Sequence, residues 1–167
     1  MNFIDLFFGD KTTTLVAPTE IGMTCQSIDT LLQFYVSAFS FTLISRIDVP
    51  ARAAALTPLS QCGYTVVRLQ SPFGERLKLL SPASLVSYRA STRPSENILD
   101  GAHTIFITLI VADLTATRDR AIALGATAMG DNVHIRPDLR IGFLCHPEGN
   151  YLELAEYAKV SDYRADL

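Results

Sequence analysis

A weak internal repeat is the sequence feature that most constrains how this chain folds. Residues 20–29 (EIGMTCQSID) and residues 106–115 (FITLIVADLT) are both β-rich stretches that close on a residue able to cap a helix. The side chains of Ser27 and Asp113 can each accept a hydrogen bond from an exposed N–H group in the first turn of a following helix. Because such a repeat marks a structural unit that occurs twice, two similar modules are expected.

A helix is predicted after each capping residue. Behind Ser27 the apolar side chains recur at helical spacing, and they are Ile28, Leu31, Leu32, Tyr35 and Phe39. Behind Asp113 a helix is expected to run to Leu124 and to end at Gly125, because glycine commonly terminates helices. Each predicted strand therefore feeds one helix.

A second repeated piece predicts a turn between two strands. Residues 71–79 (SPFGERLKL) return as residues 146–154 (HPEGNYLEL). In both pieces proline presets the backbone for a turn, and glycine supplies the positive φ that lets the chain reverse. Further strands are predicted at residues 41–49, 64–70, 126–133 and 141–145. Each half then has the order β, α, β, β, β.

The repeat also predicts how the chain is organised within one domain. The expected parts are an N-terminal extension (1–17), a first module (18–80), a linker (81–101), a second module (102–157) and a tail (158–167). The first module carries 11 extra residues, expected within residues 48–63 as a short helix or a flap over a cavity mouth. The linker is rich in Ser, Pro and Arg, and it can pack along the surface or cross to a second subunit.

Composition and charge exclude several kinds of partner. With 49% hydrophobic and 19% charged residues, a packed core is expected. The net charge of −3 and the lack of any Lys/Arg run argue against nucleic-acid and anionic-membrane binding. Residues 1–11 lack the basic start and the cleavage site of a secretion signal. The three cysteines lack CxxC spacing, so neither a disulfide framework nor a zinc ribbon is expected and a cytoplasmic location is favoured.

The repeat and its closing motif resemble a known superfamily. The strand, the cap, the helix with Phe34 and Tyr35, and above all HPEGNYLEL at residues 146–154 are similar to the vicinal-oxygen-chelate superfamily, whose modules end in Asp-Pro-Asp-Gly-Asn-x-Ile-Glu-Leu. Glyoxalases, bleomycin-resistance proteins and extradiol dioxygenases are its members. The resemblance covers roughly residues 18–157. It implies an α+β fold in which two βαβββ modules form a cupped, half-open barrel around one cavity.

The resemblance also implies where a metal would be bound. Family metal sites take a His, Glu or Gln from the first and the last strand of each module. The matching positions here are Glu20, Lys78, Phe106 and Glu153. Phe106 has no donor atom and the Lys78 ammonium repels cations, so only the two glutamates can bind a metal. No cofactor is therefore expected, and a divalent metal held by Glu20 and Glu153 is the alternative.

The set Glu20, Lys78 and Glu153 allows three interpretations. The first is a structural salt-bridge cluster within a binding pocket. In the second, a carboxylate is a general base and Lys78 stabilises an oxyanion on the substrate. The third is an unusual metal site that recruits other residues.

Further residues are candidates for the cavity or for that unusual metal site. Aromatic or cationic side chains that can line a cavity or its rim are Tyr35, Tyr64, Arg68, Phe106, Arg136 and Arg140. Of the histidines, His103 is expected to point away from the ligand position, His134 to lie in a polar surface loop, and His146 to lie in a solvent-facing turn.

Three function classes follow from these residues. The first is a metal-free cavity protein that binds or transforms a small organic metabolite. The second is a metal-dependent enzyme of the glyoxalase, epimerase or dioxygenase type. The third is a pure interaction module. A homodimer is expected, because the family pairs modules within or between chains and the linker is long enough for an arm exchange.

Overall fold

The computed structural model describes residues 17–84, 97–100 and 104–166. The expected N-terminal extension lies almost wholly outside these residues, and so do most of the expected linker and His103. Strand β4 continues to Pro82, two residues into the expected linker, and a short 3-10 turn, η1 (Ile98–Asp100), precedes the second module.

The repeat seen in the sequence is confirmed as two modules of the same topology. The first contains β1 (Glu20–Thr24), α2 (Ile28–Phe39), β2 (Thr42–Val49), α3 (Ala51–Ala54), β3 (Tyr64–Gln70) and β4 (Arg76–Pro82). The second contains β5 (Phe106–Ile110), α4 (Leu114–Ala123), β6 (Thr127–Arg136), β7 (Leu139–Cys145) and β8 (Tyr151–Tyr157), and α5 (Val160–Tyr163) follows it. The predicted α+β class is correct.

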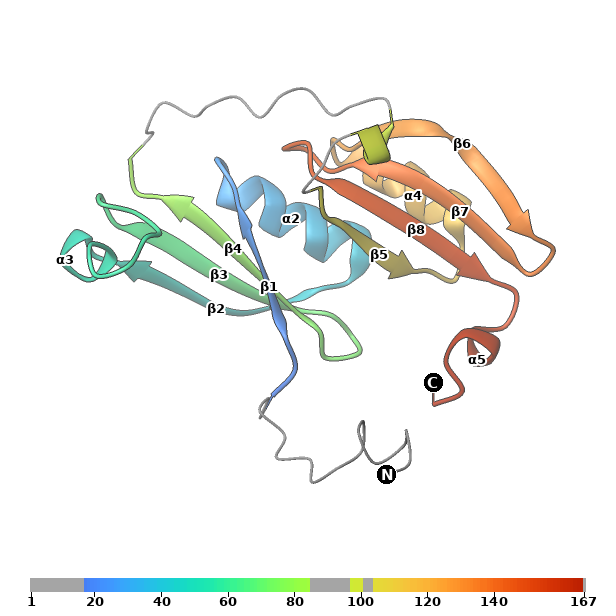
Figure 1. The fold of residues 1–167 in the computed structure, drawn as a ribbon, viewed down its shortest axis with the longest axis horizontal. Helices are drawn as coiled ribbons and strands as arrows, with labels where there is room; N and C mark the ends of the chain where they lie inside the picture. The colour runs from blue at the N-terminus through green and yellow to red at the C-terminus, as the bar shows by residue number, and fades with distance from the viewer. Residues whose placement is uncertain (1–16, 85–96, 101–103, 167) are drawn as a thin grey trace, which may run out of the picture.

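Each module forms its own four-stranded sheet. The strand orders are β1-β4-β3-β2 and β5-β8-β7-β6, so the first and last strands of each module pair in parallel and the remaining pairs are antiparallel. Figure 1 shows the first sheet on the left, the second on the right, and α2 in view between them. The two described sheets do not close into a barrel.

Both predicted helix caps are present. Ser27 Oγ accepts a hydrogen bond from the N–H group of Thr30 at 3.4 Å, and Asp113 Oδ1 accepts one from the N–H group of Ala116 at 2.9 Å. Gly125 has a φ of +99°, a backbone conformation that side chains disfavour, and α4 ends just before it. The local sequence therefore sets where both helices begin and where α4 ends.

The two modules share one hydrophobic core. Its fully buried members include Leu31, Phe34 and Tyr35 of α2, and residues of both sheets pack around them, namely Val67, Leu69, Leu79, Leu144, Leu152 and Leu154. Leu114 and Ala121 of α4 belong to the same cluster. Full burial of each of these leucines contributes about 2 kcal/mol, so the shared core is a strong reason for the modules to stay together.

The β7–β8 turn fixes the second module to the first. The carboxylate of Glu148 accepts hydrogen bonds at 2.7 Å from the N–H groups of both Gln26 and Ser27, where α2 begins. His146 is only 2% exposed, and its Nε2 lies 3.3 Å from the sulfur of Met23 in β1. The expectation of a solvent-facing His146 is therefore wrong, because this turn packs against the other module and not against water.

Two smaller expectations concern segments away from that turn. His134 is exposed as expected, but it lies in β6 paired with Arg140 and not in a loop. The 11 extra residues of the first module include α3 and the connection that leads to Gly63, as expected.

No helix within the described ranges is long and apolar enough to cross a membrane.

Candidate functional site

Strand alternation assigns the candidate residues to the faces of the two sheets that are opposite the helices. Leu77, Leu79 and Val67 point into the helix-side core, so their neighbours in sequence point to the other face. On the first sheet this face carries Glu20, Tyr64, Val66, Arg68, Arg76, Lys78 and Leu80. On the second sheet it carries Phe106, Thr108, Tyr151, Glu153, Phe143 and Cys145.

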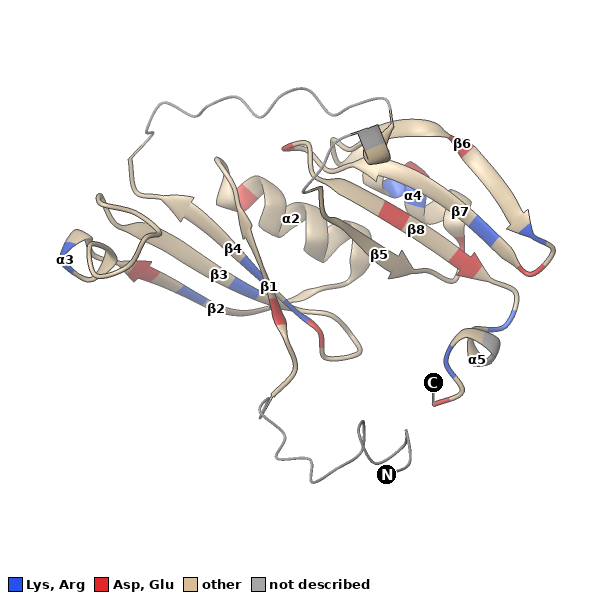
Figure 2. Ribbon diagram, viewed as in Figure 1, with Lys and Arg blue, Asp and Glu red and all other residues tan. Residues whose placement is uncertain are grey.

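An ion cluster lies on the open face of the first sheet. Glu20 Oε2 is 3.3 Å from Lys78 Nζ, and Glu20 Oε1 is 3.4 Å from Arg68 Nε. The three side chains come from three adjacent strands, β1, β4 and β3, and Figure 2 shows basic segments of β3 and β4 beside the acidic start of β1. Their side chains are 28–33% exposed, so the cluster is half-buried and still reachable by solvent.

The cations determine the protonation of Glu20. Partial desolvation by itself raises the pKa of the carboxyl, but hydrogen bonding and charge from Lys78, followed by Arg68, hold the pKa of Glu20 below its ordinary value. Glu20 is therefore an anion at neutral pH. A carboxylate with a lowered pKa is also a weaker base, which makes Glu20 a poor proton acceptor for catalysis.

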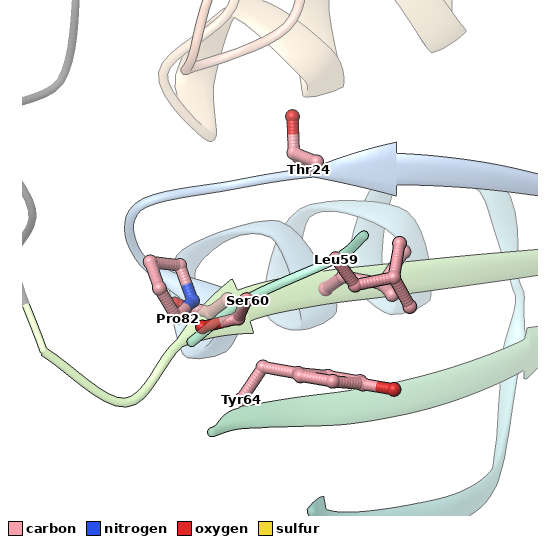
Figure 3. Close-up of a pocket in the computed structure, with 7 residues that line it drawn as sticks. Thr24, Leu59, Ser60, Tyr64 and Pro82 are labelled. Atoms are coloured by element: carbon pink, nitrogen blue, oxygen red, sulfur yellow. The ribbon is translucent and has the colours of Figure 1, made fainter. Parts of the chain in front are cut away.

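A small hollow adjoins this cluster on the same face. Its volume is about 50 Å³, and it is lined by Thr24, Leu59, Ser60, Tyr64, Leu80, Ser81 and Pro82. Figure 3 shows the ring of Tyr64 lying along the hollow, with Ser60 and Pro82 near one end and the phenol oxygen pointing toward the other. Since one water needs roughly 10–15 Å³ of such space, the hollow holds only the end of a metabolite.

The open face of the second sheet has a different character. Thr108 Oγ1 donates a hydrogen bond of 2.6 Å to Glu153 Oε2 across the β5–β8 pair. Phe106 and Phe143 lie edge to face with ring centroids 6.3 Å apart, and Phe106 is 41% exposed. This face therefore offers an aromatic surface with one carboxylate, where the first sheet offers cations.

The structure brings only some of the sequence-predicted residues together. Glu20, Lys78 and Arg68 are in contact, and Tyr64 lies on the same face. Glu153 belongs to the other sheet, and no hydrogen bond or ion pair between described residues connects it to Lys78 or Glu20. Lys78 was expected to lie between Glu20 and Glu153. In the structure Glu20 lies between Lys78 and Arg68.

Three other candidates lie outside the ion cluster. Tyr35 is completely buried, with 0% of its surface accessible, and its hydroxyl donates a hydrogen bond to the sulfur of Met23 at 3.7 Å. It is a core residue, and the expectation that it lines a cavity is wrong. The apolar spacing of α2 places Tyr35 on the side of the helix that packs against the sheets. Arg136 forms an ion pair with Asp138, and Arg140 forms one with Glu156.

The described residues do not fit a divalent metal ion at the family position. Each Glu20 oxygen already faces a cation, Phe106 has no donor atom, and Glu153 is in the other sheet. Within the described part of the chain, no three His, Cys, Asp or Glu side chains are close enough to hold an ion together. An ion here would also be repelled by Lys78 and Arg68.

Sequence reasoning missed four residues of these faces. Arg76 is the register partner of Glu20, and the strand pattern of residues 76–82 could have placed it on the face of Lys78. Thr108 could have been found in the same way, two positions after Phe106. Leu59 and Ser60 belong to the extra residues of the first module, which have no counterpart in the second, and only the three-dimensional structure places them at the hollow.

Comparison with known proteins identifies the fold. A glyoxalase family protein from Bacillus cereus is similar in structure, with a TM-score of 0.73 and 18% identity over 89% of this chain and 98% of that one. The trypanothione-dependent glyoxalase I of Leishmania major aligns with a TM-score of 0.62 and 16% identity, over 87% of this chain and 90% of that one. A glyoxalase-related enzyme from Fulvimarina pelagi aligns with a TM-score of 0.56 and 16% identity, over 86% and 90%.

The chain thus has the fold of these glyoxalase-family proteins, as the sequence resemblance implied. No family model matches the sequence, and no curated protein matches it.

Proposed function

We propose that this protein binds or transforms a small organic metabolite without a resident metal, and that it uses the open sheet face around Glu20, Lys78 and Arg68. The observation that carries the proposal is the ion cluster, in which Lys78 stands at one of the positions where the resemblance implies a metal ligand and Arg68 lies beside it. Lysine and arginine can supply locally the positive charge that an ion would give to a substrate oxygen. The structural neighbours described as glyoxalases support small-molecule chemistry for this fold.

The two sheets have unequal roles in this proposal. Lys78 and Arg68 attract and orient an oxygen-bearing group, whereas Glu20 keeps the two cations in place. If proton transfer takes place, we propose Glu153 as the base, because it accepts a hydrogen bond from the neutral hydroxyl of Thr108 and forms no ion pair with a described cation. Phe106, beside Glu153 on the same face, supplies an apolar contact.

For Glu153 and Lys78 to act on one ligand, the two open faces must meet around it. We therefore propose a homodimer in which a second copy covers these faces. Large apolar side chains on the strands support this, since Ile47, Val133 and Ile135 are 45–57% exposed. Light scattering tests it, and a monomer at all micromolar concentrations would contradict it. We also propose a cytoplasmic location, in keeping with three cysteines that are not paired in disulfides.

Two measurements test the metal-free binding proposal. Elemental analysis of protein purified without added metal is expected to give far less than one Zn, Ni, Mn or Fe per chain. A binding screen of small metabolites by amide NMR, run with and without a chelator, is expected to give hits that the chelator leaves unchanged. Near-stoichiometric metal together with binding lost on chelation would instead favour a metal-dependent enzyme of the glyoxalase, epimerase or dioxygenase type.

Two lysine variants test whether the hits bind at the ion cluster. Lys78→Met is expected to weaken binding of the hits, because it removes one of the two cations beside Glu20. Lys159→Met is the matched control, since Lys159 is exposed at the start of α5 and makes no recorded ion pair with a described residue. Equal binding by both variants would contradict a role for the cluster.

A further inference from the structure

We infer that the ligand has an anionic group at one end and a flat apolar body, and that it lies lengthwise along β3 and β4 of the first sheet. This rests on the proposed function and adds to it the chemical class and the position of the ligand. Three features of one sheet face carry the inference: an excess of positive charge, an adjoining apolar hollow, and a loop that closes the end of that hollow.

The charge on this face is unbalanced in favour of an anion. Among the described residues of β1, β3 and β4, three cations, Arg68, Arg76 and Lys78, share this face with one carboxylate, that of Glu20. Arg76 has no ion pair with any described residue, although it is the register partner of Glu20. A neutral or cationic ligand group would leave this excess unmatched, whereas a carboxylate or phosphate would neutralise it.

The contacts inside the cluster leave donors for a ligand. Glu20 approaches Arg68 through Nε, and the two terminal nitrogens of that guanidinium have no acceptor among the described residues. The distances of 3.3 and 3.4 Å are longer than the usual 2.7–2.9 Å of a tight charge-assisted hydrogen bond, so Glu20 satisfies the cations only in part. A planar anion can therefore pair with the free side of Arg68.

The hollow lies at the distance that a small aromatic acid spans. Leu80 lines it and is two residues from Lys78 on the same strand, which corresponds to about 7 Å. Val66 lies between Arg68 and Tyr64 and is 7% exposed, so the segment between the two ends carries no further charge and is mostly covered by neighbouring side chains. The ring of Tyr64 along the hollow offers a surface on which another flat ring can stack.

The extra residues of the first module close the end of the hollow. Leu59 and Ser60 line it, and Ser60 Oγ donates to the carbonyl of Gly63 at 2.9 Å and accepts from the N–H group of Cys62 at 3.1 Å. Gly63 has a φ of +82°, and a Cβ there would lie 2.7 Å from the carbonyl oxygen of Val49. The loop is thus anchored where it meets the sheet, and its residues Leu59 and Ser60 bound the space that is left for the apolar body.

Three probes that differ only in their head group test this inference. They are 3-phenylpropionate, 3-phenylpropanol and 3-phenylpropylammonium, titrated into the full chain while backbone amide shifts are followed by NMR. The propionate is expected to shift amides within residues 64–82, and the alcohol and ammonium compounds are expected to bind at least about tenfold more weakly. Arg68→Met and Lys78→Met should each reduce this preference for the acid, whereas Lys159→Met should preserve it.

A second variant separates the two ends of the ligand. Leu59→Ser is expected to weaken the acid and the alcohol by the same factor, because it removes apolar contact without changing charge. Equal affinity for the alcohol or the ammonium compound would overturn the anionic class, and shifts confined to residues 139–157 would overturn the position. If none of the three probes binds while other compounds from the metabolite screen do, this inference fails and the proposed function stands; if the whole screen is empty, both fail.

Discussion

Acidification is expected to destabilise this protein through His146, the histidine buried between the modules. Burial lowers the pKa of His146 from 6.5 to about 4, so the folded chain keeps the ring neutral where the unfolded chain protonates it. Since the folded pKa is the lower one, the stability from this group is complete above pH 6.5 and is lost as the pH falls toward 4. A shift of this size corresponds to about 3 kcal/mol of unfolding free energy.

The contacts of the ring explain why it resists protonation. The N–H group of Glu148 donates to Nδ1 at 3.0 Å, and the side-chain nitrogen of Asn150 lies 2.8 Å from Nε2, with the sulfur of Met23 at 3.3 Å. A proton added to Nδ1 would face that N–H group directly. Phe34 and Tyr35 of α2 surround the ring with apolar edges, and the nearby Glu148 carboxylate is already bonded to two backbone N–H groups.

The assay is urea unfolding of the wild type and of His146→Asn at several pH values between 7 and 4. The difference in unfolding free energy between them is expected to shrink by about 3 kcal/mol as the pH falls. His134→Asn is the control, because His134 is exposed, and its difference from the wild type should stay nearly constant. A flat profile for His146→Asn would refute the reasoning, and if that variant does not fold, an NMR titration giving His146 a pKa near 6.5 would do so.

Three other substitutions test the core, the contact between modules and the ion cluster. Leu79→Ala is expected to cost about 2–5 kcal/mol in urea unfolding, because it opens a cavity at a fully buried position; a loss below 1 kcal/mol would count against the shared core. Glu148→Gln should lower the unfolding free energy by about 1–2 kcal/mol, since a neutral amide binds the two N–H groups at the start of α2 less strongly than a carboxylate; an unchanged unfolding midpoint would contradict this. Lys78→Met should raise the pKa of Glu20 in an NMR titration of the carboxyl carbon, because the largest opposing charge is removed; Lys159→Met should leave that pKa unchanged, and equal pKa values in all three proteins would contradict the cluster.

Local signals in the sequence were sufficient for the fold. The caps Ser27 and Asp113 and the Pro/Gly turns act within a few residues, and all of them lie where the pattern indicated. The short elements η1 and α5 were not predicted, and the ends of some strands differ, as in β6, which continues to Arg136 because it pairs with β7 across two irregularities in register. Such extensions depend on the partner strand and are not encoded in one stretch of sequence.

The site was harder to predict, because its contacts join residues that are far apart in the chain. The sequence around His146 predicts an exposed turn residue. Its burial depends on α2 and β1, which cover it and lie more than 100 residues earlier in the chain. Tyr35 lies on the apolar side of its helix, and the spacing cannot distinguish a core from a cavity. The pairing of Lys78 with Glu20 follows from strand order. That the third residue of the ion cluster is Arg68 and not Glu153 depends on how the two sheets are placed.

The two modules share a fold but differ at the matching positions of their open faces. Glu20 corresponds to Phe106, Gly22 to Thr108 and Lys78 to Glu153, as the strand registers of the two sheets require. Since the helix-side residues at the same strands are apolar in both modules, the core constrains both modules alike and leaves these outward positions free to differ. The metal site that the resemblance implies would need donors from both faces, whereas the proposed anion-binding site needs cations from one face only. In the proposed function, the change of sign between Lys78 and Glu153 gives the modules different roles: the first binds the charged group of the ligand, and the second offers an aromatic surface and a proton acceptor.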